Sequence, residues 1–427
     1  MSVNSDFLAR AEKVFVGGVN SPVRSFRRVE GKPLIIKRAQ GAFIEDVEGK
    51  KYLDLVMSYG PHLFGHHYDP ILKTLAKTLE EGLCYGMTSE REIQWGEKML
   101  SFLPACWKVR ALSSGTEACM TAIRLARGYT GRDVIVKCSG HYHGHVDSLL
   151  FDAGSGLATL SEESVPDSAG VPQSLGKLLK IIPFNDVSAL EKVFNEYGEQ
   201  IAAFIFEPIM GNMGVVLPEE NFLKKARELT QKHKALLILD EVMTGFRVAK
   251  NSAWGRFDLQ PDLVTFGKIV GGGSALSALA GDAKILDSLA PLGKVYQAGT
   301  LSGNPIGVSA GLAMLEEIDR CDPYPSLEKL GEKLEKTLQN VALKKGIQVS
   351  VVRCASMLST HFRQEKPRNA AETRDIDYEL YKKFFWSAVK HGVMLPPSPF
   401  EAYFLATAHC QHEDQLLSSF EKILSEI

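Results

Sequence analysis

Lys268 is the residue of this chain whose surroundings first suggest chemistry. It follows the apolar run Leu263 to Phe266, which is typical of a strand, and it precedes three glycines, Gly271 to Gly273. A lysine at the end of a strand can point into a cleft, lose its proton and act as a nucleophile or base. Most lysines are instead solvated surface residues, so Lys268 has to be weighed together with the residues that could converge on it.

A Ser-Ser-Gly-Thr turn over residues 113–116 separates a predicted strand from a predicted helix. The hydroxyls of Ser114 and Thr116, the free N–H groups and the positive end of the helix dipole together can hold a phosphate. Thr300, ahead of another predicted helix, offers the same chemistry. Capping of the helix is the commoner role for such residues. The chain has no P-loop and no dinucleotide-binding glycine motif after a strand.

Two carboxylates, Asp240 and Glu241, end the apolar run 236–239. A carboxylate at a strand end can bind a metal ion or pair with a protonated ring nitrogen of a cofactor. Capping of a turn is an equally good explanation.

Three histidines at alternate positions, His141, His143 and His145, follow the strand predicted over 134–136. A His-x-His pattern can bind zinc or a related ion, although no carboxylate or cysteine cluster in the sequence completes a ligand set. The alternative is that Tyr142 stacks its ring on a flat ligand.

The elements that must position these residues alternate along the chain from about residue 109. Apolar strands are predicted over 109–112, 134–136, 201–206, 236–239 and 262–266, with helices between them. This order predicts an α/β fold with a mostly parallel sheet covered by helices on both faces. Ligands of such sheets bind beyond the carboxyl ends of the strands, which is where the candidate residues lie.

Three regions are predicted: residues 1–60 as an N-terminal segment that packs with the small domain, 61–320 as the large α/β domain, and 321–427 as a small α+β domain. The first contains a predicted hairpin over 44–54. Residues 152–175 are rich in Gly, Ser, Ala and Pro, and a loop of this length is usually disordered or functional. We expect an active-site lid over 154–170.

Composition limits the classes of protein to which the chain can belong. A hydrophobic content of 45% and a charged content of 23% are ordinary for a soluble globular protein. A net charge of −2 gives no hint of a nucleic-acid or membrane partner. Seven scattered cysteines without a Cys-x-x-Cys pair indicate reduced thiols. With no signal or transit character in the first residues, the expected location is the cytoplasm.

One cofactor would use the candidate residues together. Pyridoxal 5′-phosphate needs a lysine, a carboxylate for its ring nitrogen, a phosphate cup and aromatic or aliphatic walls. Lys268, Asp240, the turn at 113–116 and Tyr142 would supply these parts.

Five short motifs, in this order, resemble the class III, fold-type-I aminotransferases. They are Ser-Gly-Thr-Glu-Ala (114–118), Tyr-His-Gly (142–144), Glu-Pro (207–208), Asp-Glu-Val-x-Thr-Gly-Phe-Arg (240–247) and Gly-Lys (267–268). Within that class, residues 17–24, 211–216, 296–305 and 397–402 resemble the glutamate-1-semialdehyde 2,1-aminomutases. The resemblance implies a homodimeric enzyme of tetrapyrrole synthesis. Using pyridoxal and pyridoxamine 5′-phosphate, it would convert (S)-4-amino-5-oxopentanoate to 5-aminolevulinate.

The resemblance also implies roles for single residues. Lys268 would be the Schiff-base lysine and proton shuttle. The other cofactor contacts would be Asp240 at the ring nitrogen, Val242 and Tyr142 on the two ring faces, Asn212 near the hydroxyl, Ser114, Gly115 and Thr116 at the phosphate, and Thr300 reaching it from the partner subunit. Ser21 and Arg24 would bind the substrate carboxylate, and Glu401 would lie near the substrate amine.

The sequence departs from the usual family pattern at Tyr59, at 86–88 and at 274–281. Two other functions therefore stay open at this point. One is an ordinary class III aminotransferase with a separate amino donor. The other is a metal-dependent hydrolase built on His141, His143 and His145.

Overall fold

The structure is a computed structural model that describes residues 3–153 and 166–427. Most of the predicted lid, residues 154–165, lies outside this described part. The chain forms two compact units. The first unit comprises Met1–Tyr68, Pro323–Pro367 and Thr373–Ile427, and the second unit comprises Asp69–Asp322 and Arg368–Glu372.

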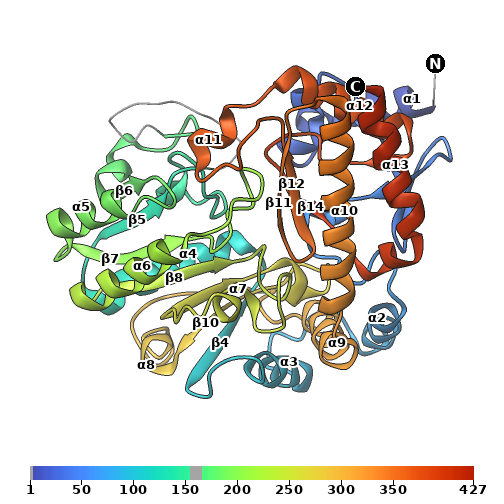
Figure 1. The fold of residues 1–427 in the computed structure, drawn as a ribbon. Coiled ribbons are helices and arrows are strands. Elements are labelled where there is room, and N and C mark those ends of the chain that lie inside the picture. Colours follow the sequence, from blue (N-terminus) through green and yellow to red (C-terminus); the bar gives the residue numbers. More distant parts are fainter. Residues whose placement is uncertain (1–2, 154–165) are drawn as a thin grey trace. The chain divides into compact units, whose positions relative to one another are not determined.

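The second unit is built on a seven-stranded sheet of order β4-β10-β9-β8-β7-β5-β6 (Figure 1). Its strands are β4 (Trp107–Leu112), β5 (Val134–Cys138), β6 (Leu179–Ile182), β7 (Ile201–Phe206), β8 (Leu236–Glu241), β9 (Leu263–Phe266) and β10 (Ser277–Asp282). Strands β6, β5, β7, β8 and β9 are parallel, whereas β10 pairs antiparallel with both β9 and β4. The predicted, mostly parallel sheet is confirmed. Strands β6 and β10 were not predicted.

Both faces of this sheet are buried because its strands carry apolar side chains on both sides. In β7, Ala203 and Ile205 belong to the core cluster that also contains Ala122 and Ala126 of α4. The alternate residues Phe204 and Phe206 meet the ring of Phe222 from α6 instead. The period of two along β7 thus places α4 and α6 on opposite faces of the sheet.

The helices of the second unit connect the strands and cover the sheet (Figure 1). They are α2 (Asp69–Glu81), α3 (Glu90–Leu100), α4 (Gly115–Thr130), α5 (Val187–Tyr197), α6 (Glu220–His233), α7 (Ser252–Arg256), α8 (Ala283–Leu286) and α9 (Pro305–Cys321). The short α11 (Ala370–Arg374) begins in this unit.

The first unit contains two small sheets and the remaining helices. One sheet is β1 (Ile36–Gln40), β2 (Phe43–Asp46), β3 (Lys51–Asp54) and β13 (Val393–Met394), and the other is β11 (Ser350–Cys354), β12 (Met357–His361) and β14 (Tyr403–Phe404). The helices are α1 (Val3–Val14), α10 (Tyr324–Lys345), α12 (Tyr378–Lys390) and α13 (Glu413–Glu426). The predicted hairpin is confirmed, because β2 and β3 pair antiparallel.

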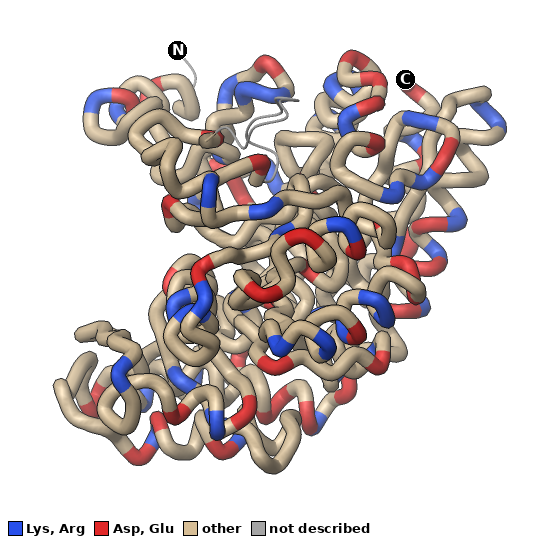
Figure 2. The backbone as a smooth tube through the Cα atoms, turned by 90° about the vertical axis from the view of Figure 1, so that its left-hand side faces the viewer, with Lys and Arg blue, Asp and Glu red and all other residues tan. Residues whose placement is uncertain are grey.

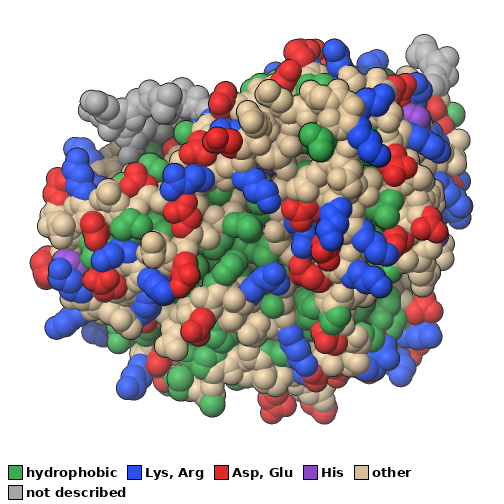
Figure 3. Space-filling model, in the orientation of Figure 1, with side chains coloured by type: hydrophobic (Ala, Val, Ile, Leu, Met, Phe, Trp, Pro, Cys, Tyr) green, Lys and Arg blue, Asp and Glu red, His purple; other side chains and the backbone are tan. Residues whose placement is uncertain are grey.

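Charged residues of both signs are spread along the chain (Figure 2) and are interspersed on the face shown in Figure 3. All seven cysteines are free thiols. Within the described ranges, we find no helix with the length and apolar character needed to span a bilayer.

Candidate active site

The candidate residues of the second unit gather at one edge of its sheet. Strands β5, β7, β8 and β9 run parallel, and β4 has the same direction because both it and β9 are antiparallel to β10. The segments that follow these strands therefore start from the same edge. They carry the turn at 113–116, the histidine loop at 140–145, Glu207, Asp240 and Lys268.

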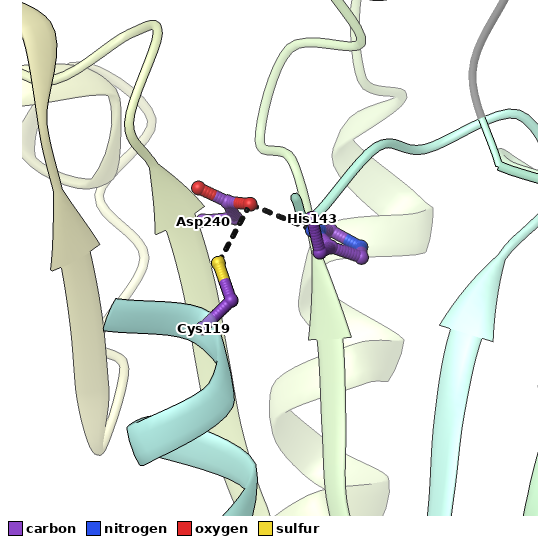
Figure 4. Close-up of side chains that lie close together, drawn as sticks. All are labelled: Cys119, His143 and Asp240. Carbon is purple, nitrogen blue, oxygen red and sulfur yellow. Dashed lines mark hydrogen bonds and ion pairs between the residues drawn. The ribbon is translucent and has the colours of Figure 1, made fainter. Parts of the chain in front are cut away.

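Asp240 is the buried centre of this group, at the carboxyl end of β8 (Figure 4). Its Oδ2 is 2.7 Å from His143 Nδ1 and accepts a hydrogen bond from the Cys119 thiol at 3.3 Å. Its Oδ1 accepts from the Thr265 hydroxyl and from the Val242 N–H, both at 3.0 Å. Donors from four segments thus fix the orientation of the carboxylate.

Burial raises the pKa of Asp240, but the hydrogen bonds from His143, the Val242 N–H and the Cys119 thiol together lower it by more, so the net shift is downward. Burial lowers the pKa of His143 itself, against the pull of Asp240. A neutral His143 therefore donates its Nδ1–H to an ionised Asp240. An ionised, immobile carboxylate is the partner that a protonated ring nitrogen requires.

Cys119, His143 and Asp240 are also close enough for their ligand atoms to be considered for a metal ion. Burial raises the pKa of the Cys119 thiol well above its usual range, and metal binding requires the thiolate. The Cys119 thiol and His143 Nδ1 are already hydrogen-bonded to Asp240 Oδ2. Among the described residues, this group does not include His141 or His145, so the proposed trio of histidine ligands does not assemble.

Glu207, at the end of β7, is a second buried carboxylate at this edge. Its Oε1 accepts from the N–H of Tyr142 at 2.8 Å, and its Oε2 accepts from Gly211 N–H and Asn212 Nδ2, both at 3.0 Å. Its own N–H donates to His141 Nδ1 at 2.8 Å. Burial raises the pKa of Glu207 to about 8, and the charge of Asp240 adds to the rise, whereas the three N–H donors oppose it.

The predicted phosphate turn lies at the start of α4. Ser114 is the N-cap, with its hydroxyl accepting from Glu117 N–H at 3.2 Å, so the capping role is present. The first N–H groups of any α-helix lack intrahelical partners and can bind an anion. A Cβ on Gly115 would lie 2.9 Å from Val242 Cγ1, so only glycine lets the helix start approach β8 this closely.

Lys268 follows β9 after one residue, Gly267, and is half-buried, with a backbone φ of 51°. A positive φ is strained for a lysine and is typical of functional sites. A Cβ on Gly267 would lie 3.0 Å from Val242 Cγ1, which places the Lys268 loop beside the loop of Asp240. Among the glycines that follow, a Cβ on Gly272 would lie 2.4 Å from the carbonyl oxygen of Ala310 in α9. Position 272 therefore needs a glycine because α9 packs closely against it.

Thr300 lies on an exposed loop before α9. Asn304 is the N-cap of that helix and accepts from Gly307 N–H at 2.8 Å. Capping therefore does not explain Thr300, whose carbonyl oxygen accepts from the Cys84 thiol at 3.9 Å.

The predicted substrate residues all lie in the first unit. Ser21 is the N-cap of a short 3-10 helix, Pro22–Ser25, that carries the exposed Arg24, and Glu401 is buried. Burial raises the pKa of Tyr59, with Glu401 adding to the rise and Arg24 opposing it. These electrostatic effects place Tyr59, one of the departures from the family pattern, near two of the three predicted substrate residues, Glu401 and Arg24.

The model of the family described as aminotransferase class III matches residues 26–426 of this chain. The chain belongs to the class III aminotransferases. Relatives named glutamate-1-semialdehyde 2,1-aminomutase include that of Akkermansia muciniphila, 44% identical over 97% of this chain and 96% of its own. That of Polynucleobacter asymbioticus is 46% identical over 95% of this chain and 94% of its own.

Solved structures of this family are similar over almost the whole chain. An omega-transaminase from Sphaerobacter thermophilus has a TM-score of 0.91 at 27% identity, covering 99% of this chain and 97% of its own. A glutamate-1-semialdehyde-aminomutase from Pseudomonas aeruginosa has a TM-score of 0.87 at 24% identity, covering 99% and 94%. At 24% identity, the similarity to the Pseudomonas aeruginosa structure shows only that the fold is shared.

Two residues at the site were not predicted to contribute to it. Cys119 is one of the seven scattered cysteines, and its contact with Asp240 depends on the packing of α4 against the sheet. Glu207 was noticed only as part of a Glu-Pro motif. Its position directly after the buried strand 201–206 was the available signal, because a carboxylate there must be buried and therefore paired.

Proposed function

We propose that this chain catalyses the glutamate-1-semialdehyde 2,1-aminomutase reaction, which converts (S)-4-amino-5-oxopentanoate to 5-aminolevulinate in tetrapyrrole synthesis. The observation that carries the proposal is the ionised, hydrogen-bonded Asp240 on β8, the strand that pairs with β9, which precedes Lys268. The names of relatives with 42 to 46% identity over nearly their full length support this reaction within the family.

The residues present fit pyridoxal and pyridoxamine 5′-phosphate. Asp240 would hold the ring nitrogen, Val242 and Tyr142 the two ring faces, and Asn212 the hydroxyl side. The start of α4 at Ser114, Gly115 and Thr116 would hold the phosphate. When bound, the cofactor carries the amino group and withdraws electrons from the substrate carbon.

The chain's own groups bind the substrate and move protons. The Nζ of Lys268 takes a proton from one carbon and returns it to another, as a general base and then a general acid. The Arg24 guanidinium, with Ser21, binds the substrate carboxylate. Glu401 lies at the substrate amine. The loop over 154–170 is proposed to exclude water during turnover.

We also propose that the enzyme is a homodimer located in the cytoplasm. The second unit exposes an apolar face made of residues from α2, α3 and two loops: Leu79, Leu83, Met87, Ile93, Tyr296 and Leu301. The two loops lie side by side, because the Cys84 thiol contacts the Thr300 carbonyl oxygen and Gly303 lies against Glu92. Exposed apolar patches of this kind mark protein interfaces. Thr300, within this face, would reach the cofactor phosphate of the other subunit.

Incubation of the purified protein with glutamate 1-semialdehyde alone tests the reaction. We expect 5-aminolevulinate to form without an added amino donor. If no 5-aminolevulinate forms and a supplied second amine is instead consumed, with 4,5-diaminopentanoate and the carbonyl form of the donor as products, the chain is an ordinary class III aminotransferase, as the likeness to an omega-transaminase would allow.

A further inference from the structure

Glu207 lies where two loops that carry predicted cofactor contacts meet. It directly follows β7 and is 2% exposed. Tyr142 belongs to the loop after β5, and Asn212 belongs to the turn that follows β7 itself. Glu207 is the carboxylate that both loops contact.

Each oxygen of Glu207 serves one of these loops. The Oε1 atom accepts from Tyr142 N–H, and the Oε2 atom accepts from Gly211 N–H and from Asn212 Nδ2. In the reverse direction, the N–H of Glu207 donates to His141 Nδ1. Two successive residues of the loop after β5 therefore contact Glu207. His141 contacts its backbone N–H, and Tyr142 contacts its side-chain carboxylate.

All three groups that reach the Glu207 carboxylate are N–H donors. An ionised carboxylate is an acceptor at both oxygens, and such charge-assisted bonds are about twice as strong as neutral ones. A glutamine amide at position 207 would point its own NH2 group at one of these N–H donors, and no hydrogen bond could form there. The arrangement is therefore matched to the carboxylate form, which predominates above the raised pKa of about 8, so the effect of removing the charge is largest above that pH.

These contacts fix the orientation of two groups that are only partly buried, Tyr142 and the Asn212 amide. Tyr142 is 39% exposed, and the hydrogen bond to Glu207 fixes the backbone position from which its ring extends. The half-buried Asn212 amide can face either way, and donation to Glu207 fixes its Nδ2 side and hence the plane of the amide.

We propose that Glu207 is a positioning residue that sets the Tyr142 ring and the Asn212 amide in the geometry that binds the cofactor. This inference rests on the proposed function, which places the ring and the hydroxyl of the cofactor at these two residues. Glu207 itself does not touch the cofactor in this scheme.

The test is Glu207→Gln, which keeps the shape of the side chain and removes its charge. The probe is pyridoxamine 5′-phosphate, which forms no covalent bond with Lys268. We expect its Kd for the cofactor-free protein to rise roughly 10-fold or more, the range found when residues that orient a ligand-binding group are changed. The absorption band of the bound probe should shift as well.

Glu241 provides a matched control. It is also a buried carboxylate with three donors, namely Ala253 N–H at 2.8 Å, Trp254 N–H at 2.7 Å and the Thr244 hydroxyl at 3.0 Å. None of these donors is a predicted cofactor contact. Glu241→Gln should lower the thermal stability as much as Glu207→Gln does, with an unchanged Kd and absorption band for the probe. Equal losses of affinity in both variants would mean a merely structural role and would overturn the inference.

A double variant shows whether Glu207 acts through Asn212. The effects of Glu207→Gln and Asn212→Ala on the Kd should be less than additive when combined, because they disturb the same contact. Additive effects, or a Glu207→Gln variant that binds the probe like the wild type, would overturn the inference alone. A wild-type protein that binds no pyridoxamine 5′-phosphate would overturn the proposed function and this inference with it.

Discussion

At the scale of residues, the site depends on pairs of groups that change each other's protonation. His143 is kept neutral by burial and Asp240 is kept ionised by His143. The ionised state is not expected of a buried carboxyl group without its partners, since burial alone would raise its pKa. The fixed charge of Asp240 beside Lys268 is what distinguishes this strand edge from an ordinary set of turn caps.

Replacement of Lys268 by alanine should remove the proton-transfer step and leave the site otherwise formed. We expect turnover of glutamate 1-semialdehyde to fall roughly 10²- to 10⁴-fold, the usual contribution of a positioned acid–base group. Binding of pyridoxamine 5′-phosphate should persist. The exposed Lys284→Ala is the control and should keep wild-type activity. Comparable turnover in the Lys268→Ala variant would remove this residue from the mechanism.

At the scale of elements, buried polar side chains join segments that are distant in sequence. In the first unit, the 3-10 helix Thr407–His412 places His409 fully inside. Its Nδ1 accepts from Ala406 N–H at 3.0 Å, so its Nε2–H donates to the Asp54 carbonyl oxygen at 3.1 Å. Burial lowers the pKa of His409 to about 4.

This lowered pKa makes stability depend on pH. The unfolded chain binds a proton at His409 near pH 6.5 and the folded chain only near pH 4, so the free energy of unfolding falls as the pH drops through this window. Over the whole window the loss is about 3 kcal/mol. Chemical denaturation at pH 7 and pH 5 should show a smaller pH effect in His409→Gln than in the wild type. The exposed His67→Gln should keep the wild-type pH effect, and an unchanged effect in His409→Gln would contradict the prediction.

At the scale of the whole molecule, the proposed dimer would couple assembly to cofactor binding. Met87, 84% exposed, lies in the apolar face of the second unit, and Thr300 belongs to the same face. A charge in the middle of an apolar interface is costly because it loses its hydration.

We therefore expect Met87→Glu to shift the protein from dimer to monomer in sedimentation analysis. The affinity for pyridoxamine 5′-phosphate should fall at the same time, because Thr300 of the partner subunit is lost. Leu343→Glu changes an equally exposed residue, 81%, on α10 of the first unit, and it should leave the oligomeric state as it is. A wild-type protein that is already monomeric would refute the dimer.

The sequence by itself determined the family and the strands β4, β5, β7, β8 and β9, and it predicted Lys268 and Asp240 as the central pair of the site. These follow from local features, namely continuous apolar runs and short motifs directly after them. It missed β10, because the small residues of Ser277–Asp282 carry little strand preference and their pairing depends on β4 and β9.

Only the tertiary structure decided the states of the buried groups. It showed that Asp240 is held by His143 and Cys119 instead of joining a histidine metal site, and that Gly272 serves packing against α9. It also revealed Glu207 as the contact between two loops. The physical reason is that a pKa and a hydrogen bond depend on neighbours about 3 Å away, and those neighbours come from segments tens of residues apart in the sequence.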